Sequence, residues 1–450
     1  MAPANDTNLI VVHPVGRGGS IFIQSLFDGH SDVVTLPSLQ EIYTRLDESI
    51  ADSDASIDRF VRENPHLFDS RRGYLGYVGE RVSGRFGPNA DQDLRVSIDE
   101  FRSHARDLIT SRGSACGAMG RKEFFVLLHL AYARSVGASA LKETKFILYH
   151  PHSTQEYEVL LRDFPALHFI AMTRDPRQDW ESWRRVIALR RGCDPTNLTA
   201  LDCFFTAIEY SQAACEVARM AQRVEPGHFK ALDLPRLHSL NTQAMLQLCQ
   251  WLGLEFQESL LHSTFNGLAW MGNAATRRFT TGFDPEFKDK WRENLPTAEV
   301  EFISMLDYGA IKCYRYEDAP PRSAEDLNSL LAGKILSSLS SLSSLSSHGT
   351  LRGTYVRYHL HEIKSAFIVL ASHLQFRDSK AKYLSQIAGR LHGLGRQIFV
   401  TLLEIWSFSR FRDRDLPEMF RKLRKEQAYL ESHMLSDDAF LTSENLSRKT

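Results

Sequence analysis

The sequence lacks an excess of charge of either sign. Its 450 residues carry 54 Lys and Arg against 55 Asp and Glu, a formal net charge of −1. A chain with no overall field does not concentrate polyanions around itself, which disfavours a protein that coats nucleic acid. Any site for an anion must therefore be built locally, from a few side chains and backbone groups.

Paired cysteines and long apolar runs are missing as well. No stretch approaches the roughly 18 uncharged apolar residues of a transmembrane helix, and the early run Leu9 to Val12 is too short for a secretory signal. No C-x-x-C pair occurs, which argues against a zinc ribbon and a disulfide scaffold. We expect a cytoplasmic protein without a transmembrane segment. The six scattered cysteines are Cys116, Cys193, Cys203, Cys215, Cys249 and Cys313.

Strand-like and helix-like segments alternate along the first two thirds of the chain. Leu9 to Val12 is a short β-branched run that enters a glycine-rich turn, and the apolar spacing after Ser20 suits a helix. His168 to Thr173 repeats this pattern, with a helix expected from about Gln178. Such alternation predicts an α/β fold with three α/β/α layers around a central parallel sheet.

The composition changes near residue 320. Residues 337–347 consist almost wholly of Ser and Leu, with leucines three apart, a spacing that cannot stay on one helix face. We predict an α/β domain over residues 1–320, a Ser/Leu-rich linker over 321–350 and an all-helical C-terminal extension over 351–450. The extension suits a packing module; a membrane-surface or partner-binding helix stays open.

The glycine-rich turn, residues 15–20, has the features of an anion site. A strand that leads into glycines and then a helix offers close backbone approach, free N–H groups and, in Arg17, one mobile cation. The Gly-Lys-Ser/Thr ending of nucleotide-binding P-loops is absent, which disfavours an ATPase or GTPase. The alternative interpretation is a tight turn that needs glycine only for its backbone conformation.

Arg17-Gly-Gly-Ser, followed by Leu26-Phe-Asp-Gly-His-Ser-Asp-Val, resembles the opening motif of the sulfotransferase family, in its bacterial and tyrosylprotein-type branch. That family uses 3′-phosphoadenylyl sulfate (PAPS) as donor and has a P-loop-type fold. Thr173-Arg-Asp-Pro-Arg-Gln-Asp-Trp-Glu-Ser182 is similar to a second family element. Segments at Asp233, Trp270 and Lys290 also agree in order. The resemblance makes residues 1–320 the sulfotransferase domain and does not reach the extension.

The resemblance implies a role for several residues. Arg17 falls where the family contacts the 5′-phosphosulfate, and Arg174 and Ser182 fall where it holds the 3′-phosphate. An arginine at a strand end and a serine on the next helix can converge on one dianion. The remaining cofactor-binding residues that the resemblance implies are Gly18, Gly19, Ser20 and Ile21 through their N–H groups, Phe22 beside the nucleotide, and Arg277 and Arg278 as extra basic contacts.

Two departures from the family pattern stand out, and the general base stays open. Ile21 replaces a hydroxyl residue, and Tyr149 stands where the family has Lys. Glu41 lies near the position of the catalytic Glu of tyrosylprotein-type members, and His150 has a side chain suited to accepting a proton near pH 7. His13 and His152 are further candidates for the base. Each of these residues could equally be structural.

The implied function is transfer of a sulfuryl group from PAPS to a hydroxyl of a carbohydrate, small metabolite, lipid or peptide. The reaction is an in-line displacement that needs a general base and no metal, and it releases adenosine 3′,5′-bisphosphate. Two alternatives stay open: a binding module with a decayed site, motivated by Ile21 and Tyr149, and a P-loop kinase. We expect no nucleic-acid partner; a homodimer and peripheral membrane contact through the C-terminal helices stay open.

Overall fold

The computed structural model describes most of the first 316 residues and a short C-terminal segment. The described residues, except Lys425, form one compact unit. Glu41, His152, Arg277 and Arg278 lie outside them, as do the predicted linker and most of the predicted extension. The described residues are 7–37, 42–72, 86–111, 119–137, 144–151, 154–191, 194–198, 200–270, 272, 282–284, 286–316, 425–426, 428–430, 432–433, 435 and 439–440.

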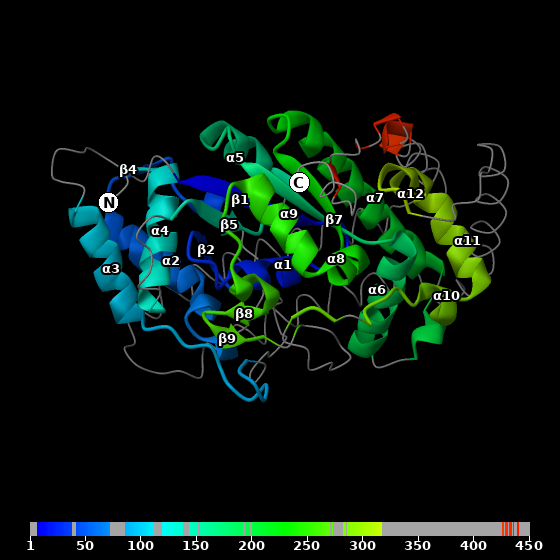
Figure 1. The fold of residues 1–450 in the computed structure, drawn as a ribbon, viewed down its shortest axis with the longest axis horizontal. Coiled ribbons are helices and arrows are strands. Elements are labelled where there is room, and N and C mark those ends of the chain that lie inside the picture. Colours follow the sequence, from blue (N-terminus) through cyan, green and yellow to red (C-terminus); the bar gives the residue numbers. More distant parts are fainter. Residues whose placement is uncertain are drawn as a thin grey trace, which may run out of the picture. The chain divides into compact units, whose positions relative to one another are not determined.

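A five-stranded parallel sheet forms the centre of the unit (Figure 1). Its strand order is β2-β5-β1-β6-β7, and every neighbouring pair is parallel. The prediction of a central parallel sheet is therefore confirmed. The strands are β1 (Asn8–Pro14), β2 (Val33–Thr35), β5 (Phe146–Tyr149), β6 (His168–Thr173) and β7 (Phe229–Asp233).

Helices connect and cover these strands (Figure 1). They are α1 (Ser20–Phe27), α2 (Ser53–Glu63), α3 (Ile98–Thr110), α4 (Arg121–Ser135), α5 (Tyr157–Asp163), α6 (Pro176–Arg191), α7 (Ala200–Arg223), α8 (Leu234–Leu240), α9 (Thr242–Leu252), α10 (Trp291–Asn294), α11 (Thr297–Leu306) and α12 (Tyr308–Cys313). Helix α6 begins two residues before the predicted start, because proline is favoured at a first helical position. Two small strand pairs join β3 (Ser49–Ile50) to β4 (Met119–Gly120), and β8 (Thr264–Phe265) to β9 (Leu268–Ala269).

The side-chain alternation along the strands explains the three layers. Ile10 and Val12 of β1 join a buried cluster that contains residues of α1, α8 and α9. On the opposite face, Tyr149 of β5 meets Phe125 of α4 with ring centroids 5.1 Å apart, and Phe169 of β6 meets Tyr157 of α5 at 5.4 Å. Both faces of the sheet are therefore covered by helices, as parallel sheets require.

A C-terminal segment returns to the same unit. The Arg315 guanidinium donates to the Leu435 carbonyl at 3.0 Å, and Arg219 of α7 lies 5.2 Å above the Tyr429 ring. Phe440 forms a parallel bridge with Ala231 of β7, an outer strand of the sheet. Part of the region predicted as an extension thus packs on the α/β unit. Among the described helices, none combines the length and apolar character that a membrane crossing needs.

Gly18 allows the loop after β1 to approach the end of β6. A Cβ added to Gly18 would lie 2.2 Å from the carbonyl oxygen of Met172, far inside contact distance. The same carbonyl accepts the Val15 N–H at 2.7 Å. Only a residue without a side chain fits between the loop and β6, so Gly18 sets where the loop lies.

We predict that Gly18→Ala lowers the free energy of unfolding by about 1–3 kcal/mol, because the new methyl group must push the loop away from β6. Denaturant unfolding followed by circular dichroism measures the loss. Gly120→Ala is the matched control, since a Cβ there meets no atom within 4 Å. Equal stability of both variants would contradict the proposed close approach.

Candidate anion-binding site

The strands end together at one edge of the sheet. Parallel register pairs Pro14 of β1 with Met172 of β6, and Thr173 of β6 with Asp233 of β7. The loop after β1 therefore lies beside the turn after β6. In open α/β sheets, ligands bind outside the carboxyl ends of the strands, where the connections from a central strand diverge. Strand β1, between β5 and β6, stands at this point.

Helix α1 starts at this edge without a side-chain cap. Gly19 is its N-cap residue and has no side chain that could accept a hydrogen bond from the first N–H groups of the helix. The N–H groups of Gly18, Gly19, Ser20 and Ile21 have no hydrogen-bond acceptor among the described residues. Uncapped N–H groups at a helix start, together with the positive end of the helix dipole, favour a bound anion.

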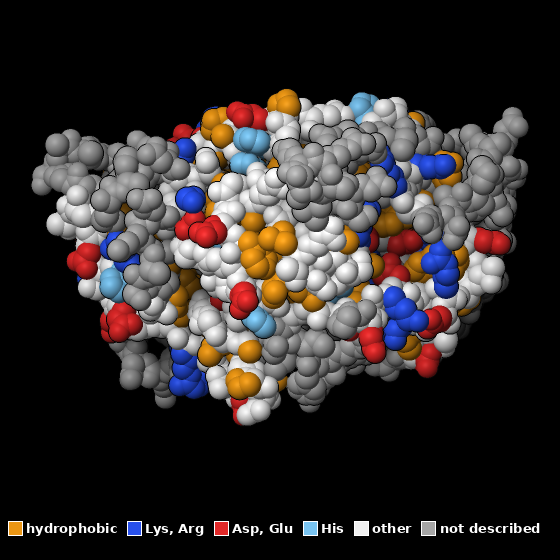
Figure 2. Space-filling model, in the orientation of Figure 1, with side chains coloured by type: hydrophobic (Ala, Val, Ile, Leu, Met, Phe, Trp, Pro, Cys, Tyr) orange, Lys and Arg blue, Asp and Glu red, His pale blue; other side chains and the backbone are white. Residues whose placement is uncertain are grey.

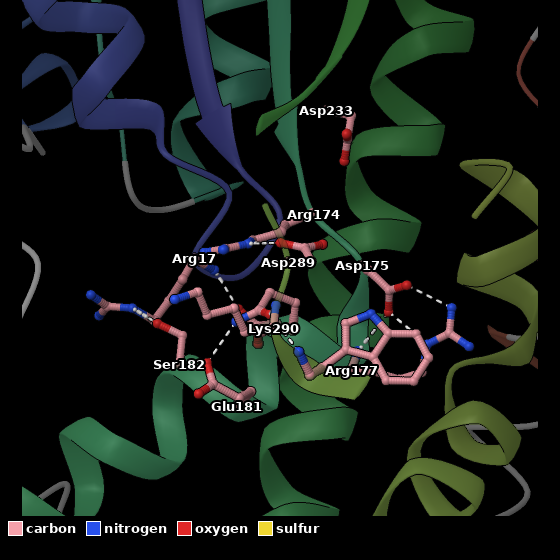
Figure 3. A network of polar contacts seen from close by, with 12 residues as sticks. Arg17, Arg174, Asp175, Arg177, Glu181, Ser182, Asp233, Asp289 and Lys290 are labelled. Carbon is pink, nitrogen blue, oxygen red and sulfur yellow. Dashed lines mark hydrogen bonds and ion pairs between the residues drawn. The ribbon is translucent and has the colours of Figure 1, made fainter. Parts of the chain in front are cut away.

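Arg17 and Ser182 meet across this edge (Figure 3). The Arg17 Nε atom donates to the Ser182 Oγ atom on α6 at 2.9 Å, and its guanidinium carbon lies 5.2 Å from the centre of the Trp183 ring. All three side chains are half-buried. The loop after β1 and the helix after β6 thus present one cation and one hydroxyl together.

Arg174 follows β6 and forms an ion pair with Asp289 (Figure 3). The Arg174 Nε atom lies 3.0 Å from Asp289 Oδ1, and the two side chains are only 12% and 16% exposed. The guanidinium carbon of Arg174 lies 5.2 Å from the centre of the Phe287 ring. Burial raises the pKa of Asp289 above its usual value, against the lowering effect of Arg174. Arg174 is therefore a partly shielded cation that already has an anionic partner.

Buried polar contacts join the segment before α10 to α6. The Gln178 amide oxygen accepts the backbone N–H groups of Lys290 and Trp291, at 2.5 and 3.0 Å. The Arg177 guanidinium lies 4.1 Å from the Trp291 ring centre and makes a two-point contact with Asp175 at 2.8 and 2.6 Å (Figure 3). These contacts hold Asp289 next to Arg174.

Phe22, on the first turns of α1, belongs to a stack of aromatic rings. Its ring lies 4.5 Å from the imidazole of His238, which in turn stacks at 4.2 Å on Phe287. Burial lowers the pKa of His238 to about 4, so its ring is neutral near pH 7. An apolar, aromatic surface therefore lies beside the helix start.

His150 and Tyr149 contact the described residues on either side of Glu41, which itself lies outside the described residues. His150 is fully buried, and its Nδ1 atom lies 3.0 Å from the amide oxygen of Gln24, whose nitrogen donates to the Leu36 carbonyl at 2.6 Å. This chain of contacts links His150 to Leu36 through Gln24. His150, one of the predicted bases, therefore packs against α1 and is not exposed to solvent in this structure.

The Tyr149 hydroxyl holds the backbone at Ile42 and Tyr43. It accepts the N–H groups of Ile42 and Tyr43 at 2.9 and 3.2 Å and donates to Glu156 at 2.5 Å. Glu156 also accepts hydrogen bonds from the backbone N–H and the hydroxyl of Thr44, each at 2.9 Å. Burial and the neighbouring carboxylate raise the pKa of Tyr149 well above its usual value. Tyr149 therefore acts here as a structural hydrogen-bonding centre.

The other predicted site residues divide into two groups. His13, near the end of β1, is buried and its ring meets Tyr157 edge-on at 5.4 Å. Glu41, His152, Arg277 and Arg278 lie outside the described residues. Sequence reasoning missed Asp289 and Glu156, because neither stands in a motif and each reaches its partner only through the fold.

Charged side chains of both signs surround the edge. On the face drawn in Figure 2, basic and acidic residues are interspersed over α6 and α10, with no patch of one sign among the coloured residues. One such pair joins Arg185 to Glu181 at 2.6 Å. On this face, the charged residues in colour thus form no positive patch beside the loop and the turn.

The chain belongs to the sulfotransferase family. Residues 10–258, more than half of the chain, match the family's model. No curated protein matches the chain. Among solved structures, it is similar to a sulfotransferase domain from the curacin biosynthetic pathway, with 15% identity, 66% of this chain and 96% of that chain covered, and a TM-score of 0.39. It is also similar to a sulfotransferase domain of the Synechococcus PCC 7002 olefin synthase, with 15% identity, 67% of this chain and 96% of that chain covered, and a TM-score of 0.35.

We predict that Tyr149→Phe lowers the free energy of unfolding by about 1.5–3 kcal/mol, because Glu156 and two backbone N–H groups lose a buried partner. Chemical denaturation measures the change. Tyr157→Phe is the matched control, since its buried hydroxyl has no hydrogen-bond partner among the described residues, so we expect that variant to keep its stability. A Tyr149→Phe protein as stable as the control would refute this role.

Proposed function

We propose that this sulfotransferase transfers a sulfuryl group from PAPS to a hydroxyl-bearing acceptor. The observation that carries the proposal is the meeting of uncapped N–H groups, Arg17 and Ser182 at the edge where β1 and β6 end. Backbone N–H groups at a helix start and side-chain hydrogen-bond donors both suit a phosphate or sulfate group. Water screens charge at a half-buried site less than at a fully exposed one, which strengthens these contacts.

In this proposal, the loop after β1 binds the 5′-phosphosulfate of the donor. The N–H groups of Gly18, Gly19, Ser20 and Ile21 donate to its oxygens, and Arg17 neutralises charge that develops on the leaving oxygen. Ile21 takes part only through its backbone, so Ser20 supplies the hydroxyl. Phe22 offers its ring to the adenine base.

The turn after β6 binds the 3′-phosphate. In this proposal Arg174 supplies a guanidinium and Ser182 a hydroxyl. The 3′-phosphate would then compete with Asp289 for Arg174 and with Arg17 for Ser182, since these are their partners in the structure. Arg277 and Arg278 are proposed to add basic contacts. In this proposal Arg17 therefore neutralises the 5′-phosphosulfate of the donor, and Arg174 neutralises its 3′-phosphate.

In sulfuryl transfer the protein positions the reactants and stabilises charge, and it forms no covalent bond to them. The acceptor oxygen forms a bond to sulfur while the bond from sulfur to the bridging phosphate oxygen breaks, and a base takes the acceptor proton. Glu41 stays our first candidate for this base. His150, the second, would require the acceptor to reach a side chain that is fully buried in this structure. The acceptor class, among carbohydrates, small metabolites, lipids and peptides, is open in this proposal.

Two arginine variants test the proposal with PAPS labelled with sulfur-35 and a panel of hydroxyl acceptors. Arg174→Ala should weaken adenosine 3′,5′-bisphosphate binding about ten- to a hundredfold, because it removes a charged hydrogen-bond partner. Arg17→Ala should instead lower the turnover number about a hundredfold, because its contact strengthens as the leaving group gains charge.

Arg106→Ala is the matched control, since Arg106 forms an exposed pair with Asp54 on α2. We expect wild-type binding and turnover from it. No label transfer, together with no bisphosphate binding to the wild-type protein, would reject the proposed function. A rise in the Michaelis constant alone in Arg17→Ala would remove Arg17 from catalysis.

A further inference from the structure

Asp179, in the first turn of α6, places a carboxylate inside the anion-binding loop. Its Oδ1 atom accepts the backbone N–H of Arg17 at 2.5 Å. A Cβ added to Gly16 would lie 2.3 to 2.9 Å from the carboxylate atoms, and Gly16 has φ +59°, in the left-handed region. The carboxyl group thus fills the concave side of the loop, where only glycine leaves room for it.

This arrangement is unusual for an anion site, because a buried carboxylate repels a bound dianion. Asp179 is only 1% exposed, so water screens little of that repulsion. The neighbouring N–H groups of Gly18, Gly19 and Ser20 are the ones proposed to hold the donor's phosphate. The loop therefore brings a negative side chain and the proposed negative ligand into one small, shielded space.

The charged and titratable groups around Asp179 come from four elements of the structure. Burial is the largest effect and raises the pKa of Asp179 to about 7, although the Arg17 N–H and the charges of Arg17 and Arg174 act in the lowering direction. At neutral pH the free protein therefore holds a mixture of acid and carboxylate at this position. The groups that face Asp179 are Arg17 on the loop, Arg174 after β6, Glu209 and Tyr210 on α7, and Asp307 before α12.

We infer that Asp179 is a positioning residue which braces the anion-binding loop through the Arg17 N–H and takes up a proton when a phosphate dianion binds there. The inference rests on the proposed function, since the dianion is the donor's 5′-phosphate. The proton comes from solvent and goes to Oδ2, because Oδ1 keeps the Arg17 hydrogen bond. A neutral carboxyl group still accepts that bond and no longer repels the ligand.

Calorimetric titration with adenosine 3′,5′-bisphosphate tests this coupling. Binding heats in buffers of different ionisation enthalpy give the number of protons taken up. Above pH 7.5 the ligand's phosphates, with a second pKa of about 6, keep a constant charge. We expect uptake of about 0.8 proton at pH 7.5 and nearly one at pH 8.5, with affinity falling up to about tenfold per pH unit between them.

Asp179→Asn separates this coupling from a purely structural role. The Asn side chain keeps an oxygen for the Arg17 N–H but cannot titrate, so binding should persist while most of the proton uptake and the fall in affinity disappear. Asp233→Asn is the comparison variant. Burial raises the pKa of Asp233 to about 7 as well, but its carboxylate caps α8 through the Arg236 N–H and interacts with the charges of Asp289 and Arg174 instead of the loop. We expect the uptake assigned to Asp179 to persist in that variant.

The outcomes are distinguishable. Binding of the bisphosphate without proton uptake by the wild-type protein overturns the inference and leaves the proposed function standing. Uptake that persists in Asp179→Asn and vanishes in Asp233→Asn assigns the proton elsewhere and also overturns it. Absence of bisphosphate binding at every pH rejects the proposed function and this inference together.

Discussion

The close contact between the loop after β1 and the end of β6 determines the rest of the site. Met172 directs its carbonyl at this loop, where it accepts the Val15 N–H and leaves no space for a side chain on Gly18. Because β1 and β6 are parallel neighbours, their two following segments leave the sheet at the same place. Arg17 and Ser182 can meet only because these segments are pressed together.

Carboxylates moderate the positive charge at this edge. Arg174 is paired with Asp289, and Asp179 lies in the concave side of the loop that carries Arg17. An unpaired, partly buried guanidinium would be costly in the absence of ligand. The carboxylates keep the unliganded site nearly neutral, and an incoming phosphate has to replace or neutralise them. In the proposed function, affinity for the donor is therefore a balance between new phosphate contacts and lost internal ones.

Much of this architecture is readable from the sequence, because it depends on local patterns. The run at Leu9, the glycines that follow it and the charged turn after Thr173 indicate strands, loop and helix without tertiary information, and the structure confirms the central parallel sheet. The family relation is readable for the same reason, since its motifs occupy those connections.

The hydrogen-bond and ion-pair partners of the motif residues cannot be predicted from local sequence patterns. Asp289 lies 115 residues from Arg174, and Glu156 holds the chain at Thr44, so each contact depends on how distant segments pack. Tyr149 illustrates the limit. Sequence comparison treats it as a lost lysine, whereas the structure shows a buried hydroxyl that holds two backbone N–H groups. A side chain's role follows from its surroundings, and these are set by the whole fold.

The central claim, that one phosphate binds at the loop of Arg17 and another at Arg174, is tested most directly by phosphorus NMR of adenosine 3′,5′-bisphosphate titrated with the protein. Its two phosphates give separate resonances. The account predicts that both resonances shift on binding to the wild-type protein, and that only the 3′-phosphate resonance returns toward its free position in Arg174→Ala. Two resonances that stay unmoved by excess wild-type protein would contradict the account.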